Sequence, residues 1–359
     1  MSVVYKKLED VCEILDSRRV PITAKDRKAG AFPYYGANGL QDYVADYIFD
    51  DELVLLAEDG GNFGSKERPI AYRVSGKCWV NNHAHVLKAK PNMHVDYLCY
   101  ALMFYDTEGL VNGATRQKLT QAAMRQMVIP YRDMTEQLQI IEKISQIVRA
   151  IEKRKEELQL LDQLVKSRFI ELFGDPLIED DRYPRVPLGS LAEVGSSKRI
   201  FEKEYVSEGI PFYRTKEIVE LSKGNRITTE LFITKERYDQ IRSEYGAPQK
   251  GDLLISAVGT IGVIWIVDGK NNFYFKDGNL LRVSATEKFV PEYLKYLLEA
   301  LISAYKSEMS SGTAYAALTI SALKEMMVYD VPHAEQEQFA AFVEQTDKSK
   351  LCGEMEVAA

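Results

Sequence analysis

The longest regular pattern of apolar and polar residues lies near the middle of the chain. Residues 134–173 contain no proline or glycine, and Thr135 is a suitable N-cap at their start. Apolar residues recur there every three or four positions, at Leu138, Ile141, Ile144, Val148, Ile151, Leu158, Leu161, Val165 and Leu172. This spacing predicts a long helix with one apolar stripe, ended by Gly174-Asp-Pro. At 1.5 Å per residue, the roughly 38 residues of this helix would span about 57 Å.

Such a stripe requires a second long helix to cover it. The segment that begins near Ala334 is the candidate, because Phe339, Phe342 and Val343 continue the same spacing. The pattern fades by about Leu351. We therefore predict a distal helix roughly half as long as the central one, followed by a tail.

Short apolar runs and glycine-rich turns occur on both sides of the central helix. The predicted strands are Leu53–Ala57, Asp252–Ala257, Ile264–Val267 and Phe273–Phe275, and the predicted helices are Val95–Phe104 and Pro291–Tyr305. Glycine-rich segments follow Ala57 and Ala257, and we interpret them as turns rather than phosphate loops. Many short strands and few helices predict a compact α+β domain on each side.

These elements form two diverged copies of one module. Asn112-Gly-Ala-Thr-Arg-Gln-Lys-Leu-Thr aligns with Ser311-Gly-Thr-Ala-Tyr-Ala-Ala-Leu-Thr, and the same offset places Glu136-Gln137 on Glu335-Gln336. Weaker matches keep the same order, such as Leu8-Glu-Asp-Val with Leu188-Gly-Ser-Leu and Pro33-Tyr-Tyr with Pro211-Phe-Tyr. The sequence therefore predicts a pseudo-two-fold repeat of two tandem globular domains, residues 1–132 and 175–331, with spacer helices at 133–174 and 332–359.

Composition and charge exclude several classes of protein. No apolar run reaches the roughly 20 residues that span a bilayer, and acids follow Met1 where a signal peptide needs an apolar core, so we expect a cytoplasmic protein with no membrane partner. The four cysteines are scattered, which argues against a disulfide framework or zinc site, and Cys99 is expected in a core. The net charge of −7 argues against a freestanding, non-specific DNA binder, although basic partners could supply phosphate contacts.

Four motifs, in this order, resemble those of the specificity subunits of type I restriction–modification systems. They are Glu136-Gln137 with its partner Glu335-Gln336, Leu172-Phe-Gly-Asp-Pro, Gly251-Asp-Leu-Leu-Ile-Ser, and Ser311-Gly-Thr-Ala-Tyr-Ala-Ala-Leu-Thr. The resemblance implies a non-catalytic subunit with two target-recognition domains, each reading half of a split, asymmetric site in double-stranded DNA. Two long antiparallel helices would separate these domains and bind two modification (methyltransferase) subunits. We assign this spacer and partner-binding role to Leu138, Ile141, Val148, Leu158, Leu161, Val165, Phe339 and Phe342.

The same resemblance implies what the other subunits supply. The complex, completed by restriction subunits, would direct methylation and restriction with S-adenosylmethionine, ATP and Mg²⁺ held on those partners, and this chain would bind none of them. The chain also has no G-x-x-x-x-G-K-[ST] loop for ATP. It departs from the family in its short distal helix, so we expect either a truncated chain or a helix pair completed in another way.

Base edges in DNA are read by Arg, Lys, Asn, Gln, Ser and Thr side chains on loops. The candidates in copy one are Arg18, Arg19, Asn62, Lys66, Arg68, Asn82, His83, Arg116, Gln117 and Lys118. Those in copy two are Lys198, Arg199, Arg214, Lys216, Lys276, Asn279, Thr313 and Tyr315. Ser17-Arg-Arg aligns with Ser197-Lys-Arg, which predicts a shared role in positioning phosphates. The region of His83 corresponds to Lys276–Asn279, where no histidine occurs, and such divergence favours two different half-sites.

Two other functions stay open. The main alternative is a coiled-coil scaffold with two protein-binding heads, which predicts no salt-sensitive affinity for DNA. The second is an enzyme, such as a nuclease with an unrecognised site. His83 and His85 would share one face of a strand, but no third ligand is evident, so we predict no metal site.

Overall fold

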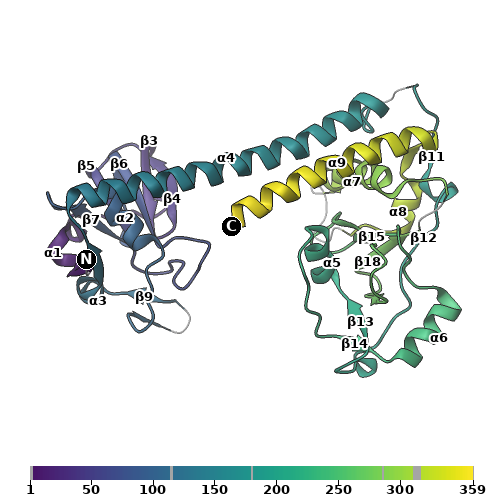
Figure 1. Ribbon diagram of the computed structural model, residues 1–359, viewed down its shortest axis with the longest axis horizontal. Helices are drawn as coiled ribbons and strands as arrows, with labels where there is room; N and C mark the ends of the chain where they lie inside the picture. The colour runs from purple at the N-terminus through teal and green to yellow at the C-terminus, as the bar shows by residue number, and fades with distance from the viewer. Residues whose placement is uncertain (1–2, 114–115, 179–180, 285–286, 310–316, 359) are drawn as a thin grey trace. The chain divides into compact units, whose positions relative to one another are not determined.

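The structure, a computed structural model, describes residues 3–113, 116–178, 181–284, 287–309 and 317–358. The chain divides into two compact units, Met1–Glu152 and Lys153–Ala359, and the boundary falls within the long helix α4 (Met134–Phe173). Figure 1 labels the elements of both units. Among the described residues, no helix has the length and apolarity needed to cross a membrane.

The first unit is a β-rich domain that carries short helices and the first half of α4. Its strands are β1 (Val4–Lys7), β2 (Cys12–Ile14), β3 (Ala29–Gly36), β4 (Gly39–Val44), β5 (Phe49–Ala57), β6 (Ala71–Val80), β7 (Ala84–Ala89), β8 (Val111–Asn112), β9 (Lys118–Leu119) and β10 (Val128–Tyr131). Its helices are α1 (Leu8–Val11), α2 (Val95–Met103), α3 (Gln121–Gln126) and the 3₁₀ turn η1 (Asp16–Arg18).

A six-stranded sheet of order β2-β7-β5-β6-β3-β4 forms the centre of this unit, with β3 and β6 parallel. Successive residues of β5 point to opposite faces, and both faces are buried. Val54 and Leu56 pack in one core with residues of α2 and α3, whereas Leu53 and Leu55 pack in a second core. A continuous apolar run in β5 is therefore what the sheet requires.

The second unit contains the second half of α4 and the remaining elements. Its strands are β11 (Arg185–Pro187), β12 (Val194–Gly195), β13 (Ile210–Tyr213), β14 (Phe232–Ile233), β15 (Leu253–Ser256), β16 (Ile264–Ile266), β17 (Tyr274–Phe275), β18 (Leu280–Val283) and β19 (Met327–Tyr329). Its helices are α5 (Thr215–Ser222), α6 (Lys235–Tyr245), α7 (Pro291–Met309), α8 (Ile320–Glu325), α9 (His333–Ala358) and the 3₁₀ turns η2 (Leu188–Ser190) and η3 (Glu202–Glu204).

The two units share one strand order, although the six-stranded sheet of the first unit corresponds to two separate sheets in the second. The order β12-β18-β15-β16 corresponds to β2-β7-β5-β6, and the parallel pair β13-β17 corresponds to β3-β6. Phe212 pairs with Tyr274 as Tyr34 pairs with Trp79, in agreement with the alignment of Pro33-Tyr-Tyr with Pro211-Phe-Tyr. The predicted α+β class and pseudo-two-fold repeat are confirmed.

A buried glutamine explains the repeated Glu-Gln motif. Gln137 is fully buried, and its Nε2 donates to the carbonyl oxygens of Asn92 at 3.0 Å and Arg132 at 2.8 Å, while its Oε1 accepts from the amide of His94 at 2.8 Å. Gln336 is also fully buried and makes the same three bonds, to Lys288, Val331 and Val290. In each unit the glutamine fixes the start of the long helix to the loop before α2 or α7.

The second unit holds more helix than the sequence pattern predicted. Helices α5 and α6 lie between β13 and β15, where the first unit has only strand β4 between β3 and β5. Helix α6 is capped by Thr234, whose hydroxyl accepts from the amide of Arg237, and it ends at Gly246. Its surface is mostly polar, so a search for apolar stripes does not find it.

Helix α4 differs from its prediction in the N-cap. Asp133 Oδ1 accepts a hydrogen bond from the amide of Glu136 at 2.9 Å, so Asp133 caps the helix and the predicted cap, Thr135, lies inside it. The distal helix α9 continues to Ala358, beyond the predicted end near Leu351.

The second half of α4 runs antiparallel to α9 within the second unit (Figure 1). Phe169 packs edge-on against Phe339 at 5.4 Å between ring centroids, and further along α9 Lys350 pairs with Asp162, earlier in α4, at 2.7 Å. Val165 and Phe339 are fully buried, so these two of the predicted spacer positions belong to the core of the unit and cannot contact a partner. Leu158, Leu161 and Phe342 are half-buried.

In the first unit the α4 stripe is less covered. Leu138 and Val148 are 48% and 38% exposed, and Ile141 is partly buried against the core. Leu138 and Val148 are thus the predicted spacer positions of this unit that stay accessible to a partner.

Candidate nucleic-acid interface

Three loops of the first unit meet where β5 ends. The amide of Glu58 donates to the carbonyl of His83 at 2.8 Å, and the carbonyl of Glu58 accepts from the amide of Leu119 at 2.7 Å. The amide of Gly60 donates to the carbonyl of Gln117 at 3.1 Å. These bonds join residues 58–60, 81–83 and 116–118 into one surface, which brings together several residues predicted to contact DNA.

One carboxylate oxygen of Asp59 holds two of these residues. Asp59 Oδ1 lies 2.6 Å from Nδ1 of His83 and accepts from Nη2 of Arg116 at 2.7 Å, and the same Nη2 lies 3.3 Å from His83 Nδ1. The side chain of Asp59 is 17% exposed, whereas that of Arg116 is 61% exposed. The guanidinium of Arg116 also lies over Gly60, which has a φ of +64°, and a Cβ there would approach Arg116 Nε to 3.3 Å.

A cleft of about 540 Å³ opens beside this carboxylate. Its lining includes the predicted residues Asn82, His83 and Arg116 together with Arg27, Tyr34, Gln41, Asn81 and the segment 21–24. Arg27 stacks over Tyr34 at 4.2 Å, and its buried Nε finds no hydrogen-bond partner among the described residues. The side chain of Asn81 is fixed by two hydrogen bonds: its Nδ2 donates to Gln41 Oε1, and its Oδ1 accepts from the amide of His83. The cleft therefore offers guanidinium and amide donors of the kind that read base edges.

Arg27, Gln41 and Asn81 are cleft residues that were not among the candidates from sequence. Arg27 lies in the basic cluster Lys25-Asp-Arg-Lys, which was a usable signal. Gln41 and Asn81 carry no such signal, because only the pairing of β3 with both β4 and β6 brings them together.

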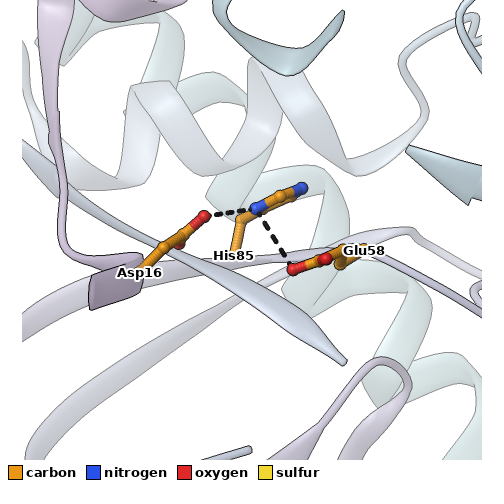
Figure 2. Close-up of side chains that lie close together, drawn as sticks. All are labelled: Asp16, Glu58 and His85. Carbon is orange, nitrogen blue, oxygen red and sulfur yellow. Dashed lines mark hydrogen bonds and ion pairs between the residues drawn. The ribbon is translucent and has the colours of Figure 1, made fainter. Parts of the chain in front are cut away.

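A buried acid–histidine cluster lies next to the three loops. Figure 2 shows His85 between Asp16 and Glu58, with its Nδ1 at 2.6 Å from Asp16 Oδ2 and 3.7 Å from Glu58 Oε2. The other ring nitrogen, Nε2, is 2.9 Å from the carbonyl oxygen of Leu119. Both ring nitrogens thus face acceptors, and His85 satisfies both only with a hydrogen on each nitrogen. The cluster ties Leu119, at the end of the Arg116 loop, to the sheet.

The two carboxylates of this cluster are held in their charged forms. Burial alone would raise the pKa of Asp16, but hydrogen bonds from His85, Val86 and Gln121 outweigh it and lower the pKa below its ordinary value. Burial also opposes ionisation of Glu58, and hydrogen bonds from Arg19 and Lys118 lower the pKa of Glu58 in the same way. Both groups carry a negative charge at neutral pH.

Asp16, Glu58 and His85 are also spaced like metal ligands, since one ligand atom of each lies within 4.8 Å of the others. The donor set does not fit an open metal site, however. Asp16 Oδ2 already accepts from His85 and Gln121, and Glu58 Oε2 accepts from Arg19 at 2.6 Å. His85 Nε2 is not free to bind a cation either, because it already faces the carbonyl oxygen of Leu119 at 2.9 Å. The geometry is that of a closed hydrogen-bonded network.

Two predictions from the sequence are wrong at this cluster. Arg19 does not face a phosphate: its side chain is 13% exposed and bonds to Glu58 and to the carbonyls of Asp16 and Ala84. His83 and His85 do not share one exposed face, because His83 lies in the turn before β7 while His85 is fully buried. Strand β7 begins only at Ala84, so the rule that every second side chain of a strand shares one face does not include His83.

The remaining candidates of copy one lie outside the cleft lining. Lys118 pairs with Glu58 at 3.0 Å and is 48% exposed, and Gln117 is exposed. Arg18 is exposed, donates to the carbonyl of Ile48 and stacks on Phe49 at 4.8 Å. Asn62 donates to the carbonyl of Pro69, and Lys66 and Arg68 are exposed on the same loop.

Two of the eight candidates of copy two, Arg199 and Lys276, lie against another carboxylate. Asp277 is 13% exposed and lies between β17 and β18, in the loop that corresponds to Asn81–His83. Its Oδ2 accepts from Arg199 Nε at 2.8 Å, and its Oδ1 lies 3.8 Å from Lys276 Nζ. In the same region Asn279 is exposed, and Lys198 Nζ stacks over Tyr245 at 4.7 Å.

The other candidates of copy two are separate from this group. Arg214 precedes α5 and pairs at 2.9 Å with Glu217, which is buried, and Lys216 is exposed on the first turn of that helix. Thr313 and Tyr315 lie outside the described residues.

The architecture and the motifs agree with one known family. A family model for the type I restriction modification DNA specificity domain matches residues 2–161 and 182–352, once for each copy of the repeat. The chain belongs to the type I restriction–modification specificity family. A relative from Haemophilus influenzae, a putative type I restriction enzyme specificity subunit called S.HindORF215P, is 31% identical over 347 residues, which are 95% of this chain and 87% of the relative.

Solved structures of this family share the fold. The S subunit of the type I restriction–modification system of M. genitalium aligns over 100% of this chain and 92% of its own, with a TM-score of 0.56 and 15% identity. A chain from a structural study of complex assembly and conformational transition of the type I system aligns over 99% and 94%, with a TM-score of 0.58 and 16% identity. The resemblance drawn from the sequence motifs is confirmed.

Proposed function

We propose that this chain is the DNA-recognition subunit of a type I restriction–modification complex and that each unit reads one half of a split, asymmetric site in double-stranded DNA. The observation that carries the proposal is the cleft of the first unit. There Asn82 and His83 from one loop and Arg116 from another lie beside Arg27 and Gln41. Arginine suits guanine and asparagine or glutamine suits adenine, so such a lining favours readout of base edges.

The unlike surfaces of the two units support an asymmetric site. The first unit has a cleft with amides and a histidine, whereas the second has Arg199 and Lys276 against Asp277 and Lys198 over Tyr245. The two surfaces use corresponding loops of one topology but different residue types. Different donors and acceptors select different base sequences.

We further propose that the chain supplies recognition and its partners supply chemistry. The donors and acceptors of the acid–histidine cluster are engaged with one another, which does not suit a cluster that must bind a substrate. Two modification subunits would dock along the helices, where Leu138, Val148 and Leu164 are exposed on α4. Restriction subunits would join that assembly. S-adenosylmethionine, ATP and Mg²⁺ would be held by these partners.

The proposal is tested by methylation mapping of DNA from cells that contain the assembled complex. Residues 175–331 would be exchanged for the corresponding segment of another specificity subunit. We expect the first half of the methylated sequence to stay and the second half to change. Methylated sites that do not change with this exchange would refute the proposal, and so would a complex that binds DNA with no dependence on salt.

A pair of point variants sharpens the same test in the first unit. Arg116→Gln should relax or shift the preference at one or two base pairs of the first half-site, with a loss of about 1–3 kcal/mol for a specific contact. The matched control is Arg125→Gln in the same unit, because Arg125 pairs with Glu9 away from the cleft lining. The control should leave the methylated sequence unchanged.

A further inference from the structure

Both units place a shielded carboxylate against the basic residues of their candidate DNA surface. In the first unit Asp59, 17% exposed, holds His83 and Arg116. In the second unit Asp277, 13% exposed, lies against Arg199, which is 67% exposed, and Lys276. In each unit the basic side chains are more exposed than the carboxylate beside them.

The two carboxylates occupy different positions in the shared topology. Asp59 follows β5, whereas Asp277 lies between β17 and β18. After β15, the counterpart of β5, the chain continues with Ala257-Val258-Gly259, so Gly259 stands where the first unit has Asp59 and the second unit has no acid there. A shielded carboxylate beside basic residues therefore recurs at a different place in each unit.

We propose that Asp59 and Asp277 act as specificity-determining residues that suppress the binding of non-target DNA. The inference rests on the proposed DNA-recognition function. Non-specific affinity comes almost entirely from basic side chains that neutralise phosphates. A guanidinium that is already paired with a carboxylate gains less electrostatic free energy when it binds a phosphate, and the nearby carboxylate repels that phosphate.

Base contacts are less affected by the same carboxylate. A guanidinium carries five N–H groups, and Asp59 engages Arg116 through Nη2 alone, on a side chain that is 61% exposed. The side chain can therefore donate to a base edge while it stays paired with Asp59. The pair also holds the guanidinium beside Asn82 and His83 in the cleft rather than free to reach any phosphate. The carboxylate thus lowers affinity for non-target DNA more than affinity for the target.

The experiment compares the assembled complex carrying the wild-type chain, Asp59→Asn or Asp277→Asn. Affinities are measured by fluorescence anisotropy, over a range of salt, for the duplex identified by methylation mapping and for duplexes with either half or both halves scrambled. The control is Asp46→Asn, which removes the same charge from an exposed carboxylate that accepts from the neighbouring amide of Tyr47. Asp59→Glu tests rescue, because it restores the charge.

We expect Asp59→Asn to raise affinity for the fully scrambled duplex roughly three- to tenfold, the range for one screened charge near a phosphate, with a smaller change for the target. The slope of log affinity against log salt should steepen by about 0.9 for each additional phosphate that the protein neutralises. Asp277→Asn should behave in the same way, most clearly when the second half-site is scrambled. Asp59→Glu should return the ratio of target to non-target affinity toward the wild-type value.

Two outcomes would overturn the inference while leaving the proposed function intact. In one, Asp59→Asn lowers target and non-target affinity by the same factor, as loss of a purely structural contact would. In the other, Asp46→Asn raises non-target affinity as much as Asp59→Asn does, so that net charge alone is responsible. If the wild-type complex binds target and scrambled duplexes equally, the proposed function itself fails.

Discussion

Replacement of Gln137 by methionine tests whether the repeated glutamine holds the start of each long helix in place. Methionine is unbranched and similar in length, so the change removes hydrogen bonds with little change in packing. Gln137 is fully buried, and its loss leaves the carbonyls of Asn92 and Arg132 and the amide of His94 without their partner. At about 1 kcal/mol for each partly buried group, we expect a loss of about 3 kcal/mol from the free energy of unfolding of the first unit.

The two tryptophans allow each unit to be followed separately. Trp79 lies in β6 of the first unit and Trp265 in β16 of the second. The Gln137→Met change would be made in a chain that already carries Trp265→Phe, so that Trp79 fluorescence reports urea unfolding of the first unit. The reference is the chain that carries Trp265→Phe alone. Gln336→Met on a Trp79→Phe background is the matched test of the second unit, where the same three bonds predict a similar loss.

The control for this prediction is Gln139→Met, which changes an exposed glutamine in the same helical turn. It should alter the free energy of unfolding by less than about 0.5 kcal/mol. A loss below about 1 kcal/mol for Gln137→Met, or an equal loss for Gln139→Met, would refute the reasoning.

Three further predictions concern the cluster, the core and the helix pair. Asp16→Asn should cost the first unit about 3 kcal/mol at neutral pH. The folded pKa of Asp16 lies below its ordinary value of 3.8, so this stability is present above pH 3.8 and is lost as the pH falls through the folded pKa. The difference in free energy of unfolding between variant and wild type should therefore shrink in urea titrations below about pH 4. Phe339→Ala should destabilise the second unit by about 3–5 kcal/mol in the Trp265 signal, and a loss under about 1 kcal/mol would place Phe339 outside the core. A double-mutant cycle on Lys350 and Asp162, 19% and 61% exposed, should give a coupling below about 1 kcal/mol, and a larger value would contradict a solvent-screened pair.

The architecture was predictable because the repeat and the helix are written in local patterns. The three- and four-residue spacing from Leu138 to Leu172 predicts α4, the absence of proline and glycine from residues 134–173 gives its extent, and alignment of the two copies agrees with the matching strand order of their sheets. The cap was missed, because Asp133 and Thr135 are both suitable residues and only the position of the first helical turn distinguishes them. Helix α6 was missed because it lacks an apolar stripe, although Thr234 and Gly246 mark its two ends.

The candidate site was only partly predictable. Residue type and loop position in the sequence are enough to select Asn82, His83 and Arg116, which the fold brings to one cleft. The same rule also selects Arg19, which has the right chemistry but is turned inward onto Glu58. A basic residue beside a loop has the same appearance in sequence whether it faces solvent or a buried acid.

Order and periodicity along the chain were enough to predict the two-fold repeat and the long helix, and short motifs carried the resemblance to the family. Which charges face outward depends instead on the folded arrangement. Asp16 and His85, far apart in the chain, are buried together, and Asp59 and Arg116 meet through loops that the sheet brings to one edge. The acids beside the basic residues could not be found from sequence. A carboxylate changes the electrostatics of a basic residue only when the two are within a few ångströms, and folding alone sets that distance.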